Sequence, residues 1–364
     1  MERNSPMQHL PAFLVVFLLA LVVTLLLMPA CTWLGVRWRV VAKAGGRRTT
    51  EADLRGVSKL GGVGLAIGFV VAALAAQLLP VPRFDPNEVV RLTGLIAGTV
   101  FLTLFGIIDD KFDLKPLPQF IGQSTAAVIA IAFQIFIEYF NNPLSGQQTD
   151  PFPFLVTASL TFFWMLTMMN TVNFLDGLDG LAGGVAFIAG VVLFINSAFM
   201  LGQTSVSLLH LALMGASLGF VLYNFYPARI FMGSGAVTLG FMLGALAIIG
   251  GAKMAAILFV IALPLMDTAW QAFNRLRRGR SPFHGDRGHL HFRLLDLGFT
   301  QRQIVGAYYL FCTCFGILTL VVESQLFKLV SLVAMMGLLA LGFVLVARMQ
   351  GRTEAKTMTP GSGV

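Results

Sequence analysis

Long apolar stretches separated by short polar segments run through almost the whole chain. A helix that crosses the hydrocarbon core of a bilayer needs about 20 mainly apolar residues, and about eleven stretches approach that length. They cover residues 12–36, 60–80, 92–108, 117–137, 153–172, 181–201, 206–224, 236–252, 253–273, 304–322 and 328–347. The pattern predicts an all-α integral membrane protein with about eleven transmembrane helices. We expect one membrane domain over 1–347 and a polar tail over 348–364.

The composition agrees with this pattern. Of the 364 residues, 57% are hydrophobic and only 12% are charged, whereas soluble domains carry about 25% charged residues. This difference excludes a soluble globular protein. The first apolar stretch is too long for a cleaved signal peptide and no small-residue cleavage site follows it, so we expect it to remain as a span.

Basic residues set the expected orientation. Eleven spans put the two termini on opposite sides, and most of the 25 Lys and Arg residues then fall on one side. The other side holds only Arg3, Arg83, Arg91, Lys253 and Lys328. Because basic loops stay in the cytoplasm, we predict an outside N-terminus and a cytoplasmic C-terminus. Topology explains most of the charge bias, so we expect no nucleic acid partner, although the basic face could also hold anionic lipid or an anionic substrate.

The same alternation places several carboxylates at the predicted cytoplasmic ends of the spans. Asp109 and Asp110 are adjacent at the end of the third stretch, and Asp176 and Asp179 lie in "NTVNFLDGLDGLAGG". If the helix continues through that segment, Asp176 and Asp179 share one face, with Cβ atoms about 5–6 Å apart. Asp267 lies about 9 Å from the end of the ninth stretch by helical rise.

Clustered carboxylates next to a bilayer need a compensating cation. An ionised Asp at the bilayer centre costs about 2.5–3.5 kcal/mol on insertion scales. Lys or Arg could supply the charge, but oxygen ligands from several helices suit Mg²⁺, which keeps water ligands and binds substrate phosphates. Two alternatives remain open, namely a solvated helix end for the aspartate pairs and a buried structural hydrogen bond for Asp267.

Histidines and arginines gather in the loop that follows the ninth stretch. They are Arg280, His284, Arg287, His289, His291 and Arg293. The His-Leu-His spacing does not match common zinc sites, whereas Arg forms forked hydrogen bonds with phosphate. A loop of this kind opposite an aspartate cluster favours a phosphate ligand, and the alternative is a basic loop that only sets topology.

Together, these features predict phosphoryl transfer at a membrane surface. A metal on carboxylates would neutralise a pyrophosphate, basic residues would hold the phosphates for in-line displacement, and one reactant would be a lipid. An ion-coupled carrier is the alternative from another class, because intramembrane Asp residues and helices broken by Gly or Pro also mark transporters. A carrier needs polar groups near the midplane and access from both faces, whereas the predicted carboxylates lie on one side.

Four segments carry a family resemblance: "FGIIDDKFD", "NTVNFLDGLDGLAGG", "PARIFMG" and "PLMDTAWQAFNRLRRGRSPFHGDRGHLHFRLLDLGFTQRQ". They resemble the motifs of the polyprenyl-phosphate N-acetylhexosamine-1-phosphate transferases, and the resemblance covers residues 12–322. It implies transfer of a sugar 1-phosphate from a UDP-linked N-acetylhexosamine to undecaprenyl phosphate, with release of UMP. It also implies a requirement for Mg²⁺, with Mn²⁺ as the alternative ion.

The resemblance extends to the branch, the location and the assembly. The last segment looks more like the branch that uses UDP-GlcNAc and begins cell-surface polysaccharides, including lipopolysaccharide, than like the peptidoglycan translocase. Members lie in the bacterial cytoplasmic membrane, with the active site open to the cytoplasm. They are often dimers, so a homodimer is left open here.

The resemblance also assigns roles to matching positions. Asp109 and Asp110 match the aspartate pair that handles metal and lipid phosphate, and Asp176 and Asp179 match a second catalytic pair. The implied metal ligands are Asp109, Asp110 and Asp179. The candidates for substrate binding are Asn170 and Asn173 in the nucleotide-sugar pocket, His289 and His291 near the donor diphosphate, and the basic residues Lys111, Arg287 and Arg293.

The chain departs from the family pattern at three places. Phe292 stands where the family has the third histidine of its motif, and the segment before Gly61 carries Ser58 and Lys59 without the usual histidine. The family also reads Phe-Met-Gly-Asp-x-Gly where this chain reads "FMGSG" over 231–235, one residue shorter and without the aspartate. In the peptidoglycan branch that aspartate is a magnesium ligand. Three interpretations follow: an active enzyme whose other aspartates hold the metal, an inactive relative, or a sequence irregularity.

Overall fold

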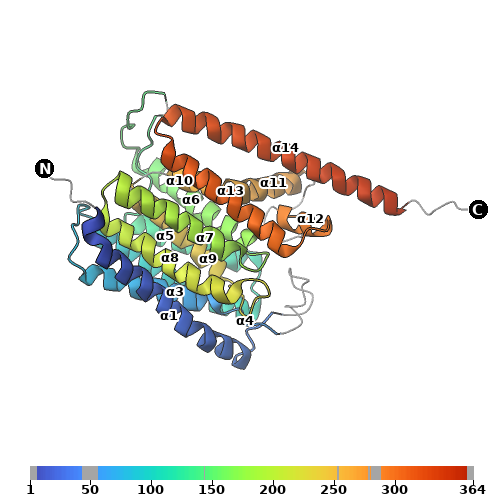
Figure 1. Ribbon diagram of the computed structural model, residues 1–364, viewed down its shortest axis with the longest axis horizontal. Helices are drawn as coiled ribbons and strands as arrows, with labels where there is room; N and C mark the ends of the chain where they lie inside the picture. Colours follow the sequence, from blue (N-terminus) through green and yellow to red (C-terminus); the bar gives the residue numbers. More distant parts are fainter. Residues whose placement is uncertain are drawn as a thin grey trace, which may run out of the picture.

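The computed structural model describes residues 6–42, 56–142, 144–251, 254–277, 279 and 288–358, and these residues form helices that lie side by side (Figure 1). The helices are α1 (Leu10–Arg37), α3 (Gly61–Ala75), α4 (Glu88–Phe112), α5 (Pro116–Ala132), α6 (Phe154–Leu175), α7 (Leu181–Ile195), α8 (Thr204–Asn224), α9 (Gly235–Ile249), α10 (Met254–Val260), α11 (Ala262–Arg277), α12 (Leu290–Asp296), α13 (Gln301–Val321) and α14 (Gln325–Met358). Short 3-10 or π-helical turns cover Pro6–His9, Ala76–Leu78 and Asn196–Met200. Within the described ranges, β pairing is limited to two isolated bridges. The predicted all-α class is confirmed.

Each predicted apolar stretch falls on one or two helices. Among the described residues, eight spans are long and apolar enough to cross a membrane: α1, α3 with its following turn, α4, α6, α7 with its following turn, α8, α13 and α14. By contrast, α5 has 17 residues and α9 has 15, and the stretch 253–273 is divided between α10 and α11 at Ile261. The protein is therefore a multi-pass helical bundle. The count of eleven, the orientation of the termini and the boundary at 347, through which α14 continues, stay predictions.

Consecutive long helices run in opposite directions, which gathers their polar connections at the two ends of the bundle. At one end, the Ser58 hydroxyl before α3 donates to the Cys31 carbonyl of α1 at 3.0 Å. At the same end, Ser234 at the start of α9 bonds Asp110 at the end of α4. We call this the carboxylate end, because the predicted aspartate pairs lie on it. Figure 1 shows α1 starting at one extreme of the bundle and α14 ending at the other.

Helix α9 lies at the centre of the bundle, where α3, α4 and α6 pack against it. Twelve of its 15 residues are buried, so it is surrounded by protein rather than lipid. Gly240 permits this packing, because a Cβ there would lie 2.6 Å from the Met168 carbonyl oxygen. In contrast, α1 buries a stripe repeating every three or four residues and exposes Leu14, Leu18 and Leu26 on its outer face, as expected for a lipid-facing helix.

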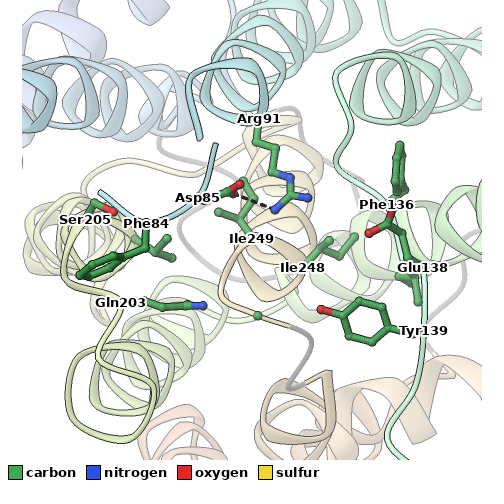
Figure 2. A pocket seen from close by; sticks show the side chains of 13 residues that line it. Phe84, Asp85, Arg91, Phe136, Glu138, Tyr139, Gln203, Ser205, Ile248 and Ile249 are labelled. Atoms are coloured by element: carbon green, nitrogen blue, oxygen red, sulfur yellow. Dashed lines mark hydrogen bonds and ion pairs between the residues drawn. The ribbon is translucent and has the colours of Figure 1, made fainter. Parts of the chain in front are cut away.

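The opposite end of the bundle holds a cavity of about 210 Å³ lined by both polar and apolar side chains (Figure 2). Its walls come from the segments around α4, α5 and α8 and from the end of α9, and the Arg91 guanidinium pairs with the Asp85 carboxylate there at 2.8 Å. Gln203 and Tyr139 point toward one another across the space in Figure 2. This cavity and the carboxylate end lie at opposite ends of α9, about 22 Å apart along the helix axis.

The start of α9 approaches the start of α3 so closely that both helices need glycine. A Cβ on Gly62 would lie 2.5 Å from the Cα of Gly235 and 2.8 Å from the Met232 carbonyl oxygen. We expect Gly62→Ala to destabilise the protein by about 1–3 kcal/mol through overpacking, measured as a lower thermal unfolding midpoint of the full chain in detergent. The matched control is Gly306→Ala on α13, where an added Cβ meets nothing within 4 Å. Equal midpoints for the two variants would contradict the close α3–α9 contact.

Candidate active site

The first aspartate pair ends α4 and is held by the neighbouring helices. Asp109 accepts hydrogen bonds from Gln119 Nε2 of α5, which lies 2.9 Å from Oδ1 and 3.1 Å from Oδ2. Asp109 Oδ2 also accepts from the Ser234 hydroxyl at 2.7 Å. Asp110 Oδ2 accepts from the Ser234 backbone N–H at 2.8 Å. The pair therefore connects the end of α4 to the starts of α5 and α9.

Lys59 supplies the positive charge nearest to this pair. Its Nζ lies 3.8 Å from Asp110 Oδ1 and 3.9 Å from Asp113 Oδ1. The Asp110 side chain is only 8% exposed, whereas that of Lys59 is 27% exposed. The ammonium therefore lies at the mouth of the site, between the buried carboxylate and solvent.

Backbone hydrogen bonds bring Lys59 and Ser234 to the same place. The Phe231 N–H donates to the Ser58 carbonyl at 2.8 Å, and the Gly61 N–H donates to the Phe231 carbonyl at 2.9 Å. Gly233 then turns with a φ of +63°, in the left-handed region that favours glycine. A Cβ there would lie 2.4 Å from Asp110 Oδ2, so glycine is needed for the backbone to approach the carboxylate.

The second aspartate pair lies in a turn rather than on a helix. Helix α6 ends at Leu175 and α7 begins at Leu181, so Asp176 and Asp179 do not share a helix face. The conditional expectation of a continuous helix is wrong: the chain leaves the helix at Asp176 and turns up to Gly180, which adopts a φ of +81° directly before α7. Asp179 is 2% exposed, and its Oδ2 accepts a hydrogen bond from the Ala228 N–H at 3.0 Å.

Polar groups on α8 and α13 fix this turn. Asn224 accepts from the Gly180 N–H at 2.9 Å and donates to the Ile230 carbonyl at 2.7 Å. The Tyr309 hydroxyl donates to the Gly180 carbonyl at 2.5 Å. Because Asn224 also bonds the segment that leads to Ser234, residues 224–234 join the two aspartate pairs.

His289, directly before α12, and His291 of α12 complete the second cluster. His289 is 3% exposed, and its Nδ1 lies 3.0 Å from Asp267 Oδ2 of α11. Its ring stacks on Phe174 of α6, with centroids 5.0 Å apart, and on His291, with centroids 5.8 Å apart. His291 packs on Gly177 between the two aspartates, because a Cβ on that glycine would lie 2.1 Å from His291 Nε2.

Asp267 fixes the orientation of His289. A carboxylate only accepts hydrogen bonds, so Nδ1 is the nitrogen that donates, and in a neutral ring Nε2 then has the lone pair. Asp267 Oδ1 also accepts from the Leu290 N–H at 3.0 Å. Nε2 is buried and has no hydrogen-bond partner among the described residues, which leaves it available to a ligand. Asp267 therefore makes the buried hydrogen bond that was the alternative for it, and its partner, His289, is itself a candidate site residue.

The other predicted residues are placed as follows. Asn170 of α6 donates to Gln123 Oε1 at 2.7 Å, which ties α6 to α5, and Asn173 is half-buried one helical turn from Asp176. Lys111 is exposed, with its Nζ 5.7 Å from the Phe112 ring centroid. Arg293 donates from Nε to the Gly288 carbonyl at 2.6 Å. Arg287 lies outside the described residues.

Sequence reasoning did not select three residues that the structure brings to the site. Lys59 and Ser234 were noticed only as departures from a family pattern, and Gln119 was not singled out. Their contacts with the aspartates join segments up to 125 positions apart, so helical spacing carries no signal for them. A basic residue two positions before the Gly61-Gly62 pair was the available clue for Lys59.

The residues present fit a magnesium ion that is shared with a substrate rather than one held by protein alone. Within the described ranges, no three His, Cys, Asp or Glu side chains lie close enough together to hold a metal ion. Asp109 and Asp110 nevertheless offer two adjacent carboxylates, and Mg²⁺ is usually bound through one or two carboxylates completed by substrate phosphates and water. Asp179 is held by the Ala228 amide, and its role as a metal ligand stays a prediction.

The structure is a multi-pass helical bundle with acidic and histidine side chains gathered at one end, as expected of an enzyme embedded in a membrane. Sequence comparisons identify its family. Residues 92–251 match the glycosyl transferase family 4. The chain is 30% identical over 323 residues to the decaprenyl-phosphate N-acetylglucosaminephosphotransferase of Mycolicibacterium smegmatis, covering 81% of this chain and 77% of the relative. It is 26% identical to the probable undecaprenyl-phosphate N-acetylglucosaminyl 1-phosphate transferase of Bacillus subtilis, covering 85% of each.

A shorter match leads to the same family. The undecaprenyl-phosphate alpha-N-acetylglucosaminyl 1-phosphate transferase of Escherichia coli is 28% identical over 218 residues, covering 56% of this chain and 58% of the relative. The chain belongs to the family of polyprenyl-phosphate N-acetylglucosamine-1-phosphate transferases. The resemblance inferred from the motifs is confirmed.

The orientation of His289 can be tested by replacing its carboxylate partner. In Asp267→Asn, an amide N–H₂ group can face Nδ1, which favours the tautomer with the hydrogen on Nε2, as in the loss of a carboxylate partner from a catalytic triad. The chain has only five histidines, so ¹⁵N-histidine NMR of the full chain in micelles can follow one ring, and His289→Gln identifies its signal. We expect a tautomer shift in Asp267→Asn and none in Asp85→Asn, a control at the opposite end of the bundle. An unchanged His289 signal in Asp267→Asn would contradict the assignment.

Proposed function

We propose that this protein transfers N-acetylglucosamine 1-phosphate from UDP-GlcNAc to undecaprenyl phosphate and releases UMP, as the first membrane step of a cell-surface polysaccharide. The observation that carries the proposal is that the segment 224–234 contacts both aspartate pairs, while His291 packs on Gly177 between the aspartates of the second pair. The named activities of the relatives support the reaction and the type of acceptor lipid. They do not distinguish between decaprenyl and undecaprenyl carriers, so the lipid is part of the proposal.

The reaction joins two anions, which defines what the residues must do. An oxygen of the lipid phosphate attacks the phosphorus that carries the sugar, a new P–O bond forms, and the bond to the UMP oxygen breaks with its electron pair leaving on UMP. Lys59 at the mouth of the first cluster and Arg275, whose guanidinium lies 5.9 Å from the Phe174 ring centroid, are placed to offset this charge. In a neutral ring, the lone pair on His289 Nε2 can accept a hydrogen bond from the nucleotide-sugar substrate.

The ion we propose is Mg²⁺, or Mn²⁺ in its place. The carboxylates of Asp109 and Asp110 would hold it. When bound, the ion would neutralise the diphosphate and stabilise the leaving phosphate. The Lys59 ammonium, 3.8 Å from Asp110, reduces the negative charge of the pair, so we expect the ion to bind together with the donor rather than tightly by itself.

We further propose that the carboxylate end faces the cytoplasm in the bacterial inner membrane. The alternation of spans in the sequence assigns most basic residues to the same side as the aspartate pairs, and the positive-inside rule then sets the orientation. A nucleotide sugar donor is a cytoplasmic metabolite, so both arguments agree. The N-terminus would lie outside and the C-terminus inside, and a homodimer remains an open assembly.

Two alternatives are separated by one assay. Ser234 in place of the family aspartate favours a relative that binds substrate without turnover. A carrier is disfavoured by the buried apolar side chains of α9, including Phe241, Met242 and Leu246, which separate the carboxylate end from the cavity at the other end.

Radiolabelled UDP-GlcNAc, undecaprenyl phosphate and Mg²⁺ in nanodiscs should yield labelled lipid and UMP. Tight donor binding without product would support the inactive relative. The absence of both product and donor binding would favour the carrier. A panel of other UDP-sugars tests the choice of sugar.

The aspartate pairs give a direct mutational test of the reaction. Asp110→Asn and Asp179→Asn should each abolish turnover, because a neutral amide cannot supply the negative charge of the carboxylate. Both variants should still fold, because asparagine has nearly the size of aspartate and keeps one acceptor oxygen. The readout is UMP release, with thermal unfolding showing that the variants remain folded. Asp85→Asn is the matched control, because it removes a carboxylate that pairs with Arg91 at 2.8 Å at the opposite end, and it should retain turnover. Near-full activity in both site variants would remove the proposed site.

A further inference from the structure

The cavity at the end of the bundle opposite the aspartate pairs contains a charge without a counter-ion, and we call it the Glu138 cavity. The charged side chains that line it are Asp85, Arg91 and Glu138. Both oxygens of Asp85 have donors, because Oδ2 pairs with Arg91 Nη1 at 2.8 Å and Oδ1 accepts from the Asn87 N–H at 2.9 Å. Among the described residues, the half-buried Glu138 carboxylate makes no hydrogen bond and no ion pair. The lining therefore has one uncompensated negative charge.

Two more acceptors lie around the same space. Gln203 Oε1 is buried and has no hydrogen-bond partner among the described residues, and a buried amide oxygen without a donor is costly. The Tyr139 hydroxyl lies across the space from Gln203 (Figure 2) and also makes no hydrogen bond within the described part of the chain. Glu138, Tyr139 and Gln203 can thus all accept hydrogen bonds from an occupant of the cavity.

The missing donors and the missing positive charge together select a class of ligand. A primary ammonium group has three N–H donors, one positive charge and no acceptor, which matches three acceptors and one uncompensated carboxylate. Phe84 and Phe136 also line the cavity, and an aromatic ring attracts a cation that lies over its face. An anion would be repelled by Glu138. A metal ion lacks ligands, because no three His, Cys, Asp or Glu side chains gather within the described ranges.

Hydrogen bonds hold the wall that carries Glu138 in place. The Ile137 N–H donates to Thr161 Oγ1 of α6 at 2.9 Å, and the Glu138 carbonyl accepts from the Phe152 N–H at 2.8 Å. The volume of about 210 Å³ is below the range of about 300–1,000 Å³ that is typical of pockets for drug-sized ligands. The cavity therefore suits an ammonium group on a short carbon chain.

We propose that the Glu138 cavity binds a primary ammonium group, with Glu138 as its counter-ion and Tyr139 and Gln203 as hydrogen-bond acceptors. Two sources offer this chemistry, namely the ethanolamine headgroup of a phospholipid and a small soluble amine. Because α4 and α8 begin at this end of the bundle, the cavity lies at the depth of lipid headgroups, where both sources can reach it. The site does not depend on the proposed transfer reaction, since it shares no residue with the carboxylate end.

Binding of n-butylamine tests the proposal. The full chain is placed in phosphatidylcholine nanodiscs, whose quaternary headgroup has no N–H, and binding is followed by ligand-observed NMR at neutral pH. We expect saturable binding of n-butylamine and none of butyrate or 1-butanol. Glu138→Gln should weaken binding at least tenfold and Tyr139→Phe about threefold, because hydrogen bonds to a charged group are the stronger ones. The matched control is Glu323→Gln, which removes an exposed carboxylate between α13 and α14 and should leave binding unchanged.

Three results would overturn the proposal: no saturable binding of n-butylamine, equal binding of 1-butanol, or equal n-butylamine affinity in Glu138→Gln and the unmodified protein. Thermal unfolding shows which variants are folded, and Tyr139→Phe is the independent test if Glu138→Gln does not fold. Lys253 follows Gly251 by two positions and lies outside the described residues, so Lys253→Ala is measured as well. Binding that appears only in Lys253→Ala would assign the cavity to the chain's own ammonium group and would also overturn the proposal.

A second arm separates the two sources of the ligand. The n-butylamine titration is repeated in nanodiscs that contain phosphatidylethanolamine. If the headgroup occupies the cavity, n-butylamine should bind at least threefold more weakly there than in phosphatidylcholine, and native mass spectrometry should show fewer retained ethanolamine lipids in Glu138→Gln than in Glu323→Gln. Equal n-butylamine affinity in the two membranes would assign the cavity to soluble amines.

Discussion

Every feature of the carboxylate end depends on satisfying charged oxygens that the fold has taken out of water. An unpaired carboxylate near a bilayer is costly, so each aspartate needs donors from its surroundings. Helix α4 cannot supply them, because its own amides are used in its backbone ladder. The donors come instead from the starts of neighbouring helices, as with Gln119 on α5 and Ser234 before α9. The need to satisfy Asp109 and Asp110 thus fixes where three helices meet.

The segment 224–234 carries this constraint to the second cluster. Its Ala228 N–H bonds Asp179, and its end reaches Ser234 and the first pair. Gly233 and Gly180 allow the turns, because both adopt positive φ. A chain that must reach two buried carboxylates within six residues has little freedom in its path, and this makes the relative placement of the clusters a property of the backbone rather than of flexible side chains.

The sequence was sufficient for the class and the helical content, because apolar length is a local signal. It also selected Asp109, Asp110, Asp179 and His289, which the structure places in two linked clusters. It could not show that α6 ends at Leu175, before both aspartates of the second pair, since glycine is common inside these spans. Nor could it pair His289 with Asp267 or Ser234 with Asp109, because those contacts depend on how distant helices pack. The pattern did find α9 as the stretch 236–252, but it could not show that protein surrounds this helix, because a buried helix and a lipid-facing span are equally apolar.

The loss of the family aspartate at "FMGSG" is physically compatible with a working site. An additional carboxylate there would face Asp109 and Asp110 at close range, and only a tightly held cation would offset the repulsion. With Ser234 the same position supplies two hydrogen bonds and no charge, and Lys59 provides a resident cation nearby. The pair can then stay buried before any substrate arrives. A site built in this way binds its ion less strongly by itself and depends more on the phosphates of the donor to complete the coordination, which couples ion binding to donor binding.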